Sequence, residues 1–258
     1  MDPASEPRAD RSELLAGIKQ GVLLATAILV LTLPPPGRSI GRQLVPVGVA
    51  AVRERGFRPA DFGSHPASAD ARFVADWVAD SGNNRGLPFI ILDKRDARVF
   101  VFAAGGRLID TSPVLLGAAP GDDSVSGIGT RPMAQVRPEE KTTPAGRFVA
   151  AAGQNAAHED VVWVDYADAV SMHRVRPVDP KERRLERLAS PDPAERRISY
   201  GCINVPVAFF EAVVWPLLTT SRAVVYVLPE VHDVHQVFAG AYSAGTKTAR
   251  HDADVARL

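Results

Sequence analysis

The sequence predicts a mainly β fold, a sandwich or barrel-like arrangement of short strands with a few accessory helices. Glycine and proline together account for 41 of the 258 residues, a turn-rich composition that does not suit a helical bundle. From residue 87 onward, short apolar runs are separated by turn sequences. Many short strands at this spacing indicate a sandwich or barrel rather than a parallel sheet of alternating strands and helices.

The predicted strands are joined by recognisable turns. Residues 93–96 form the turn of a hairpin, and Gly105-Gly106 makes the next turn. Thr143 to Phe148 is a turn that runs into a later strand. In chain order, we expect strands over residues 89–92, 98–102, 108–116, 148–152, 161–164, 169–175 and 223–228. The long irregular segment 117–141 is of a kind that often carries function.

Two segments have the apolar spacing of amphipathic helices. Residues 71–81 follow two candidate N-caps, Ser68 and Asp70. Residues 204–218 begin with Asn204, a favoured N-cap residue, and continue as an apolar stripe. The second helix therefore follows directly on the cysteine at position 202.

The segment from residue 177 to 197 is charged and interrupted by prolines. A short helix over 181–188 is expected within it. The segment is either a solvated surface excursion or a flap over a site, whose arginines would meet carboxylates on a substrate.

The amino terminus has the features of an export signal. Basic residues precede an uninterrupted run of 13 residues from Gly21 to Leu33, which three prolines follow. This length suits a secretory signal and falls short of the ~20 residues that span a bilayer. Export to the periplasm or cell envelope is expected, with the segment either cleaved or kept as an anchor that contacts the membrane. The alternative is a buried helix of a cytosolic core.

The chain thus divides into four expected parts: a signal peptide or membrane anchor over 1–36, a connector with a short helix over 37–86, a main domain over 87–229 and a loosely attached tail over 230–258.

Charge and residue composition exclude some classes of function. Lysine and arginine equal aspartate and glutamate in number, so no basic surplus indicates a nucleic-acid partner. His232 and His235 are spaced like metal ligands, but no HExxH pattern or cysteine pair supports them. We expect no metal and no organic cofactor.

Cys202 is the only cysteine. A lone cysteine among apolar residues is commonly an inert part of a core. Three observations favour a reactive thiol instead. The predicted helix begins just after Cys202, and the unpaired N–H groups and dipole of a helix N-terminus favour a thiolate. Gly201, just before Cys202, permits close approach of a substrate. In an oxidising compartment a single cysteine also lacks a disulfide partner.

His173 ends the predicted strand 169–175, where its imidazole would project to the rim of a sheet. The other histidines lie in loop-like or tail sequence. A histidine at a strand end beside a cysteine at a helix start is an arrangement for acyl transfer through a thioester.

The stretch Ser199-Tyr200-Gly201-Cys202-Ile203-Asn204 resembles the Ser-His-Gly-Cys-hydrophobic-Asn/Arg signature of L,D-transpeptidases with a YkuD catalytic domain. Met172-His173 matches the family's upstream histidine, and Thr143 to Phe148 matches its Thr-Pro-x-Gly-x-Phe turn. The resemblance covers residues 87–229. It implies the family's β-rich catalytic fold and a cysteine acyltransferase that acts on peptidoglycan stem peptides.

The resemblance also implies roles for individual residues. Cys202 would be the nucleophile and His173 its base, oriented by the backbone carbonyl of Arg174 or a neighbour. Backbone N–H groups around Gly201 and Cys202, with the Tyr200 hydroxyl, would hold the oxyanion.

Three residues near the cysteine have two possible roles each. Ser199 would position the nucleophile loop or satisfy a turn. Arg197 would bind a substrate carboxylate or lie solvated in a loop. Asn204 would contact substrate or cap the helix.

Two features depart from the family pattern. Tyr200 replaces the signature histidine, and the segment between His173 and Cys202 is about a dozen residues longer than usual. A non-catalytic peptidoglycan-binding relative therefore stays open. The acyl acceptor is open as well: the transpeptidase would form crosslinks or attach an envelope protein such as a lipoprotein, and the alternative is an L,D-carboxypeptidase or amidase of the same fold, in which water resolves the thioester.

Overall fold

The computed structural model describes residues 56–246. The strands within this range are β1 (Phe89–Asp93), β2 (Arg98–Phe102), β3 (Leu108–Pro113), β4 (Leu116–Gly117), β5 (Gly146–Gln154), β6 (Asp160–Asp165), β7 (Val170–Arg174), β8 (Arg197–Ser199), β9 (Ile203–Val205) and β10 (Ala223–Val227). The helices are α2 (Ala69–Ser81), α3 (Arg184–Ala189), α4 (Val207–Phe209), α5 (Trp215–Thr220) and α6 (Val234–Val237). The expected signal or anchor over 1–36 lies outside the described residues.

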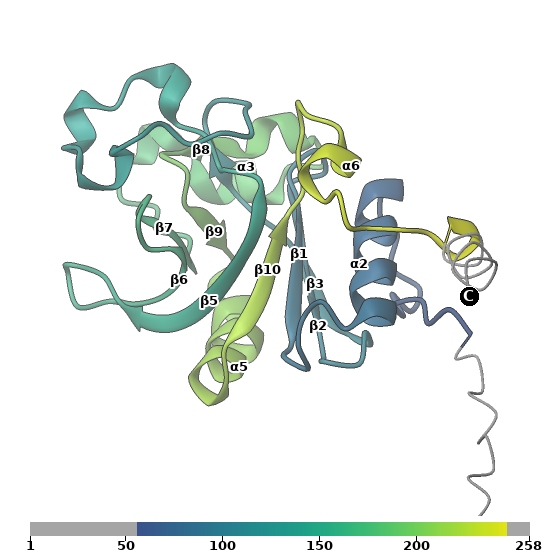
Figure 1. Cartoon of the computed structure of the whole chain (residues 1–258). Coiled ribbons are helices and arrows are strands. Elements are labelled where there is room, and N and C mark those ends of the chain that lie inside the picture. Colours follow the sequence, from purple (N-terminus) through teal and green to yellow (C-terminus); the bar gives the residue numbers. More distant parts are fainter. Residues whose placement is uncertain (1–55, 247–258) are drawn as a thin grey trace, which may run out of the picture. The chain divides into compact units, whose positions relative to one another are not determined.

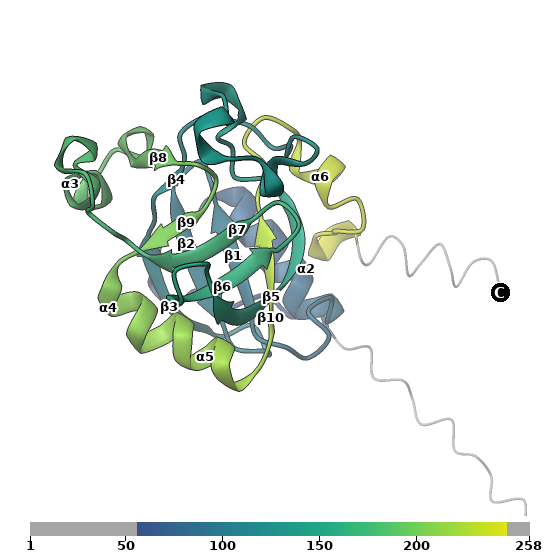
Figure 2. The same cartoon turned by 90° about the vertical axis from the view of Figure 1, so that its left-hand side faces the viewer.

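One large sheet carries the fold and confirms the mainly β prediction. Its eight strands run in the order β3-β2-β1-β10-β5-β6-β7-β9 and curve into a nearly closed barrel-like surface (Figures 1 and 2). Most neighbours are antiparallel, but β1 pairs with β10, and β7 with β9, in parallel. A separate parallel pair joins β4 to β8.

The sheet buries side chains on both faces. Along β1, Ile90 and Leu92 belong to one apolar cluster, whereas Phe89 and Ile91 belong to another. The helical segment from α4 to α5 packs on the first face. Helices α2 and α6 supply apolar side chains to the second. A run of strictly apolar residues is what burial on both faces requires, because successive side chains of a strand point to opposite sides.

Helix α2 agrees with its prediction. Ser68 is its N-cap and accepts a hydrogen bond from the Ala71 N–H at 3.0 Å. Gly82 ends the helix in the left-handed conformation at φ 68°. The helix packs against β1 through buried residues that include Val74 and Val78.

The predicted strand 108–116 is two strands, β3 and β4. Their separation follows Pro113, which ends β3. The other six predicted strands are present at nearly the expected bounds.

The helix predicted over 204–218 begins later, at Val207. Residues 203–205 form β9 instead, between β7 and a bridge to Leu115. Pairing on both sides satisfies more backbone groups than a helical first turn, so tertiary context overrides the local capping signal. The helical segment also contains a π-helical stretch, Phe210–Val214, just before Pro216. Pro216 has no N–H to donate to the preceding turn, so the helical hydrogen-bond ladder is interrupted there.

The segment after Pro229 is more firmly attached than expected for a tail. Val234, Phe238 and Ala241 are buried in the cluster beneath α2. Residues 230–242 thus differ from the expected loose tail. Their apolar residues are isolated and separated by polar ones, so the sequence pattern indicated burial only weakly. Within the described range, no helix is both long and apolar enough to cross a bilayer.

Candidate active site

The parallel pairing of β7 and β9 creates the candidate site. Met172 lies opposite Ile203, and His173 opposite Asn204, on these neighbouring strands. Because side chains alternate along a strand, Met172 and Ile203 enter the core while Ser171 and His173 face the other way. Cys202 directly precedes β9 and shares that outer side. The strands lie at the edge of the sheet that Figure 2 shows from the front.

The His173 imidazole has a defined tautomer. Its Nδ1 lies 2.8 Å from the Arg174 carbonyl oxygen, which can only accept a hydrogen bond. Nδ1 therefore carries a proton, and the neutral ring keeps its lone pair on Nε2. Nε2 faces the site, where the Asn204 Nδ2 lies 3.4 Å away.

The Cys202 thiol is partly exposed and has three polar neighbours. The Ser171 hydroxyl and the Ala169 carbonyl oxygen each lie 3.6 Å from its sulfur. Burial by itself would raise the pKa of the thiol. The hydrogen bond and charge of His173, aided by Ser171, outweigh burial and hold the pKa of Cys202 below its ordinary value.

The loop before the thiol is held by hydrogen bonds on both sides. The Ser199 hydroxyl donates to the Cys202 carbonyl at 2.6 Å and accepts from the Gly201 N–H at 3.1 Å. The Thr143 hydroxyl donates to the Gly201 carbonyl at 2.9 Å. Ser199 thus organises the loop from Ser199 to Cys202, and it occupies the Gly201 N–H that we expected to hold an oxyanion.

Gly201 is required by its backbone and its surroundings. Its φ is 127°, in a region that residues with a side chain rarely adopt. A Cβ at this position would lie 2.6 Å from the Thr142 carbonyl oxygen. The glycine therefore permits the turn into Cys202 and the close packing of the Thr142–Thr143 turn against it.

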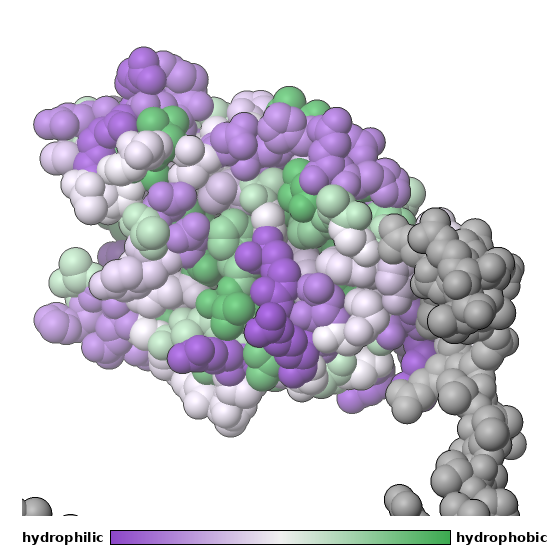
Figure 3. All heavy atoms as spheres, viewed as in Figure 1, coloured by the Kyte–Doolittle hydropathy of each residue, from purple (hydrophilic) through white to green (hydrophobic). Residues whose placement is uncertain are grey.

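A pocket of about 450 Å³ opens over the thiol and the imidazole. Cys202, His173, Ser171 and Asn204 line it together with residues of the loops around β7. Tyr200 lines its mouth, 38% exposed, and Lys141 Nζ lies 3.9 Å from the centre of the tyrosine ring. In Figure 3 the surface is hollowed at its left-hand edge, on the side where Figure 1 shows β6 and β7.

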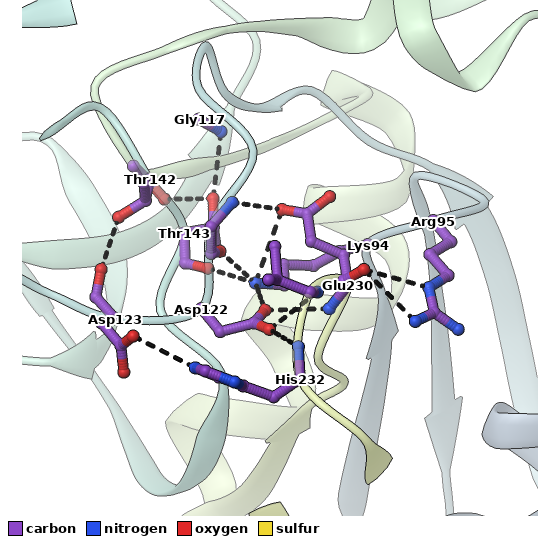
Figure 4. A network of polar contacts seen from close by, with 12 residues as sticks. Lys94, Arg95, Gly117, Asp122, Asp123, Thr142, Thr143, Glu230 and His232 are labelled. Atoms are coloured by element: carbon purple, nitrogen blue, oxygen red, sulfur yellow. Dashed lines mark hydrogen bonds and ion pairs between the residues drawn. The ribbon is translucent and has the colours of Figure 1, made fainter. Parts of the chain in front are cut away.

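Arg197 does not lie in this pocket, contrary to the substrate-binding prediction. Its guanidinium pairs with Glu230 and donates to the Lys94 carbonyl at 3.0 Å. Lys94 is fully buried and binds Asp122 at 2.6 Å and the Thr143 carbonyl at 2.8 Å, in the network of Figure 4. Arg197 therefore belongs to the buried ionic network that ties the loops together.

Asn204 is not a helix cap, as its place in β9 shows. It is fully buried, and its carboxamide lies beside the His173 imidazole rather than capping a helical N–H. Nδ2 lies 3.3 Å from the Cys202 carbonyl oxygen as well as facing His173. Oδ1 accepts a hydrogen bond from Arg184 at 2.6 Å.

Two of the pocket residues that were missed from the sequence have side chains that hydrogen-bond to Cys202 or Asn204. Ser171 stands two residues before His173 on the same strand, so the period of two could have assigned it to the same face. Arg184 had no comparable signal, because it is one of many charges in the 177–197 excursion and reaches the site only through the path of that segment.

The two histidines with metal-like spacing have other contacts. His232 Nε2 lies 3.2 Å from the Asp123 carboxylate, and the His235 ring packs against Phe73 at 4.6 Å. Among residues 56–246, no three histidine, cysteine, aspartate or glutamate side chains gather in a way that could hold a metal ion.

No family model matches the sequence, and no curated protein matches it. The structure is similar to solved L,D-transpeptidase catalytic domains. One is the catalytic domain from E. faecium L,D-transpeptidase, at 14% identity and a TM-score of 0.32, covering 55% of this chain and 98% of that one. Another is the L,D-transpeptidase (residues 123–326) from Xylanimonas cellulosilytica, at 14% identity and a TM-score of 0.34. This match covers 55% of this chain and 60% of that one.

A third is the Ldtfm-avibactam carbamoyl enzyme, at 15% identity and a TM-score of 0.33. The match covers 55% of this chain and about half, 49%, of that one. At these TM-scores the likeness does not identify the function, so the evidence for function lies in the site itself.

Proposed function

We propose that this chain is a cysteine-dependent L,D-transpeptidase that acts on peptidoglycan stem peptides. The single observation that carries the proposal is the meeting of Cys202 and His173 at one open pocket, with the imidazole Nδ1–H bound to the Arg174 carbonyl. That arrangement is a nucleophile, a base and a group that orients the base. The substrate class comes from the motif around Cys202.

The mechanism follows from the proton positions. His173 Nε2 takes the proton of the Cys202 thiol, and the sulfur attacks the carbonyl carbon of the third residue of a tetrapeptide stem. The tetrahedral intermediate collapses to a thioester as the terminal D-Ala amine leaves with the proton from His173. An amine of a second stem then attacks the thioester, and its proton passes through His173 to restore the thiol.

Charge on the carbonyl oxygen needs a hydrogen-bond donor. Because Ser199 occupies the Gly201 N–H, the candidates are the Cys202 N–H and the Tyr200 hydroxyl. Tyr200 at the pocket mouth would then replace the signature histidine in substrate contact rather than in proton transfer, which His173 already performs.

We also propose that the protein acts outside the cytoplasm, which the basic and apolar pattern of residues 1–36 supports. Peptidoglycan would be accessible there. The acyl acceptor would be a stem amine, with water or a lysine of an envelope lipoprotein as the alternatives that a product analysis separates.

The test is incubation of the purified chain with a defined tetrapeptide stem, followed by mass analysis of the products. Wild type should release D-Ala and form a new amide, and Cys202→Ala should do neither. A free carboxylate without a new amide would indicate a carboxypeptidase. Binding of the stem without any D-Ala release would contradict the enzymatic proposal and indicate a wall-binding protein.

A further inference from the structure

The long excursion between β7 and β8 reaches back into the active site through one side chain. Arg184 begins α3, and its own side chain is only 14% exposed. The guanidinium donates to the Asn204 Oδ1 at 2.6 Å and to the Glu182 carboxylate at 2.5 Å. Glu182 and Arg184 both line the pocket that contains Cys202.

This contact decides which way the Asn204 carboxamide faces. A guanidinium has only donors, so the atom beside it must be the carboxamide oxygen. The nitrogen of the same group then faces His173 Nε2 at 3.4 Å and the Cys202 carbonyl at 3.3 Å. The contact on the other side of the carboxamide agrees with this orientation, because the Cys202 carbonyl oxygen only accepts hydrogen bonds and the Asn204 nitrogen is a donor.

The orientation has a consequence for the base. A donor facing Nε2 disfavours a proton on that nitrogen, whereas an oxygen in the same place would accept from Nε2–H and stabilise it. His173 Nδ1 already donates to the Arg174 carbonyl. An inverted Asn204 would therefore favour the doubly protonated ring, which cannot accept the proton of a thiol.

We infer that Arg184 is a positioning residue, which holds Asn204 so that His173 keeps an unprotonated Nε2. The effect on catalysis rests on the proposed function, whereas the orientation of Asn204 by Arg184 does not. It assigns the unusual length of the 177–197 segment a role: the segment supplies an arginine to the site from outside the two strands that carry the nucleophile and base.

The test compares three variants of the full chain by ¹⁵N NMR of the histidine ring at one neutral pH, all in a Cys202→Ala background so that no thiol proton can reach Nε2. With Arg184 in place, His173 should show a protonated Nδ1 and a bare Nε2. Arg184→Ala should raise the fraction with a protonated Nε2 several-fold, and Arg184→Lys should restore most of the wild-type signal. Arg183→Ala removes the neighbouring arginine, which pairs with Glu186 at the surface, and should change nothing.

Activity on the tetrapeptide gives a second readout. Arg184→Ala should lower kcat at least ~10-fold with little change in KM, a part of the ~10²–10⁴ that a general base contributes. An unchanged ring spectrum in a folded Arg184→Ala protein would overturn the inference. If Arg184→Ala does not fold, Arg184→Met takes its place, because methionine keeps much of the side-chain volume but has no hydrogen-bond donor. Its His173 spectrum should shift in the same direction, and an unchanged spectrum would overturn the inference.

The two proposals fail separately. A shifted ring spectrum in a protein without transferase activity would reject the proposed function and leave the positioning role. Transferase activity in wild type, together with an unchanged ring spectrum in Arg184→Ala, would support the proposed function and reject the positioning role.

Discussion

The Cys202 thiol stands between two opposing effects. Burial favours the neutral thiol and raises its pKa, whereas the neighbouring imidazole, aided by Ser171, favours the thiolate, and the net effect is a lowered pKa. His173 is the largest of the lowering influences, so removing its ring should raise the pKa of the thiol. A cysteine in an apolar core would lack such a neighbour and would stay inert.

Alkylation of Cys202 should therefore rise with pH through an apparent pKa below the ~8.5 of a free thiol. In His173→Ala, burial is the largest remaining influence, opposed only by the hydrogen bonds of Ser171, and the midpoint should rise above the wild-type value. The measurement is the rate of iodoacetamide modification against pH, followed by mass. His65→Ala, at an exposed position far along the chain, is the control and should keep the wild-type midpoint. A wild-type midpoint at or above ~8.5 would contradict the thiolate-favouring geometry.

The elements around the thiol are joined by one buried hydroxyl. Thr143 accepts from the Gly117 N–H of β4 at 3.0 Å and donates to the Gly201 carbonyl at 2.9 Å. The threonine is completely buried. Its hydroxyl thus connects the turn before β5, the short β4 strand and the loop from Ser199 to Cys202.

Thr143→Val should leave both backbone groups without that partner and destabilise the protein by roughly 2 kcal/mol or more. The loop from Ser199 to Cys202 should loosen as well, which slows alkylation of Cys202 at a fixed pH. Urea unfolding and the alkylation rate are the two measurements. Thr143→Ser keeps the hydroxyl and should retain the alkylation rate, with only the modest cost of a lost methyl group. Equal alkylation rates in the valine and serine variants would show that the hydroxyl does not hold the loop.

The whole molecule is tied together by a buried ionic network around Lys94. Its ammonium binds Asp122 at 2.6 Å, and Asp122 also accepts the backbone N–H groups of residues 230–232 (Figure 4). Burial opposes the charge on Asp122, yet Lys94 and these N–H groups lower the pKa of its carboxyl to about 2 from an ordinary 3.8. The β1–β2 turn, the 117–145 loop and the carboxyl-terminal segment thus meet at one carboxylate.

A carboxyl whose pKa is lowered by folding stabilises the folded state above its unfolded pKa, and the contribution disappears as the pH falls through the folded value. Asp122 should therefore contribute roughly 2 kcal/mol above pH ~4 that is lost between pH ~4 and ~2. The measurement is the free energy of unfolding in urea at several pH values. In Asp122→Asn this part of the acid dependence should be absent.

Asp123→Asn is the matched control, because the neighbouring carboxylate is 87% exposed and contacts only the edge of the network. Its acid dependence should follow wild type. Parallel curves for wild type and Asp122→Asn below pH 4 would contradict the assigned role of the buried carboxylate.

Some of this molecule follows from local sequence. Ser68 and Gly82 bound α2 because capping and the left-handed turn are properties of a few adjacent residues. The hairpin of β1 and β2 follows for the same reason. The pairing of Cys202 with His173 was predicted from the residue types and from the family motif that surrounds the cysteine.

The tertiary structure decided the rest. Asn204 looks like a helix cap in the sequence, but β7 and Leu115 pair with its strand from both sides. Arg197 looks like a substrate ligand, but Glu230 lies 33 residues away in the chain and beside it in the fold. Arg184 reaches the site only because the excursion folds back over β9. Local rules describe a residue's neighbours along the chain, whereas burial and long-range pairing depend on segments that meet only when the sheet has closed.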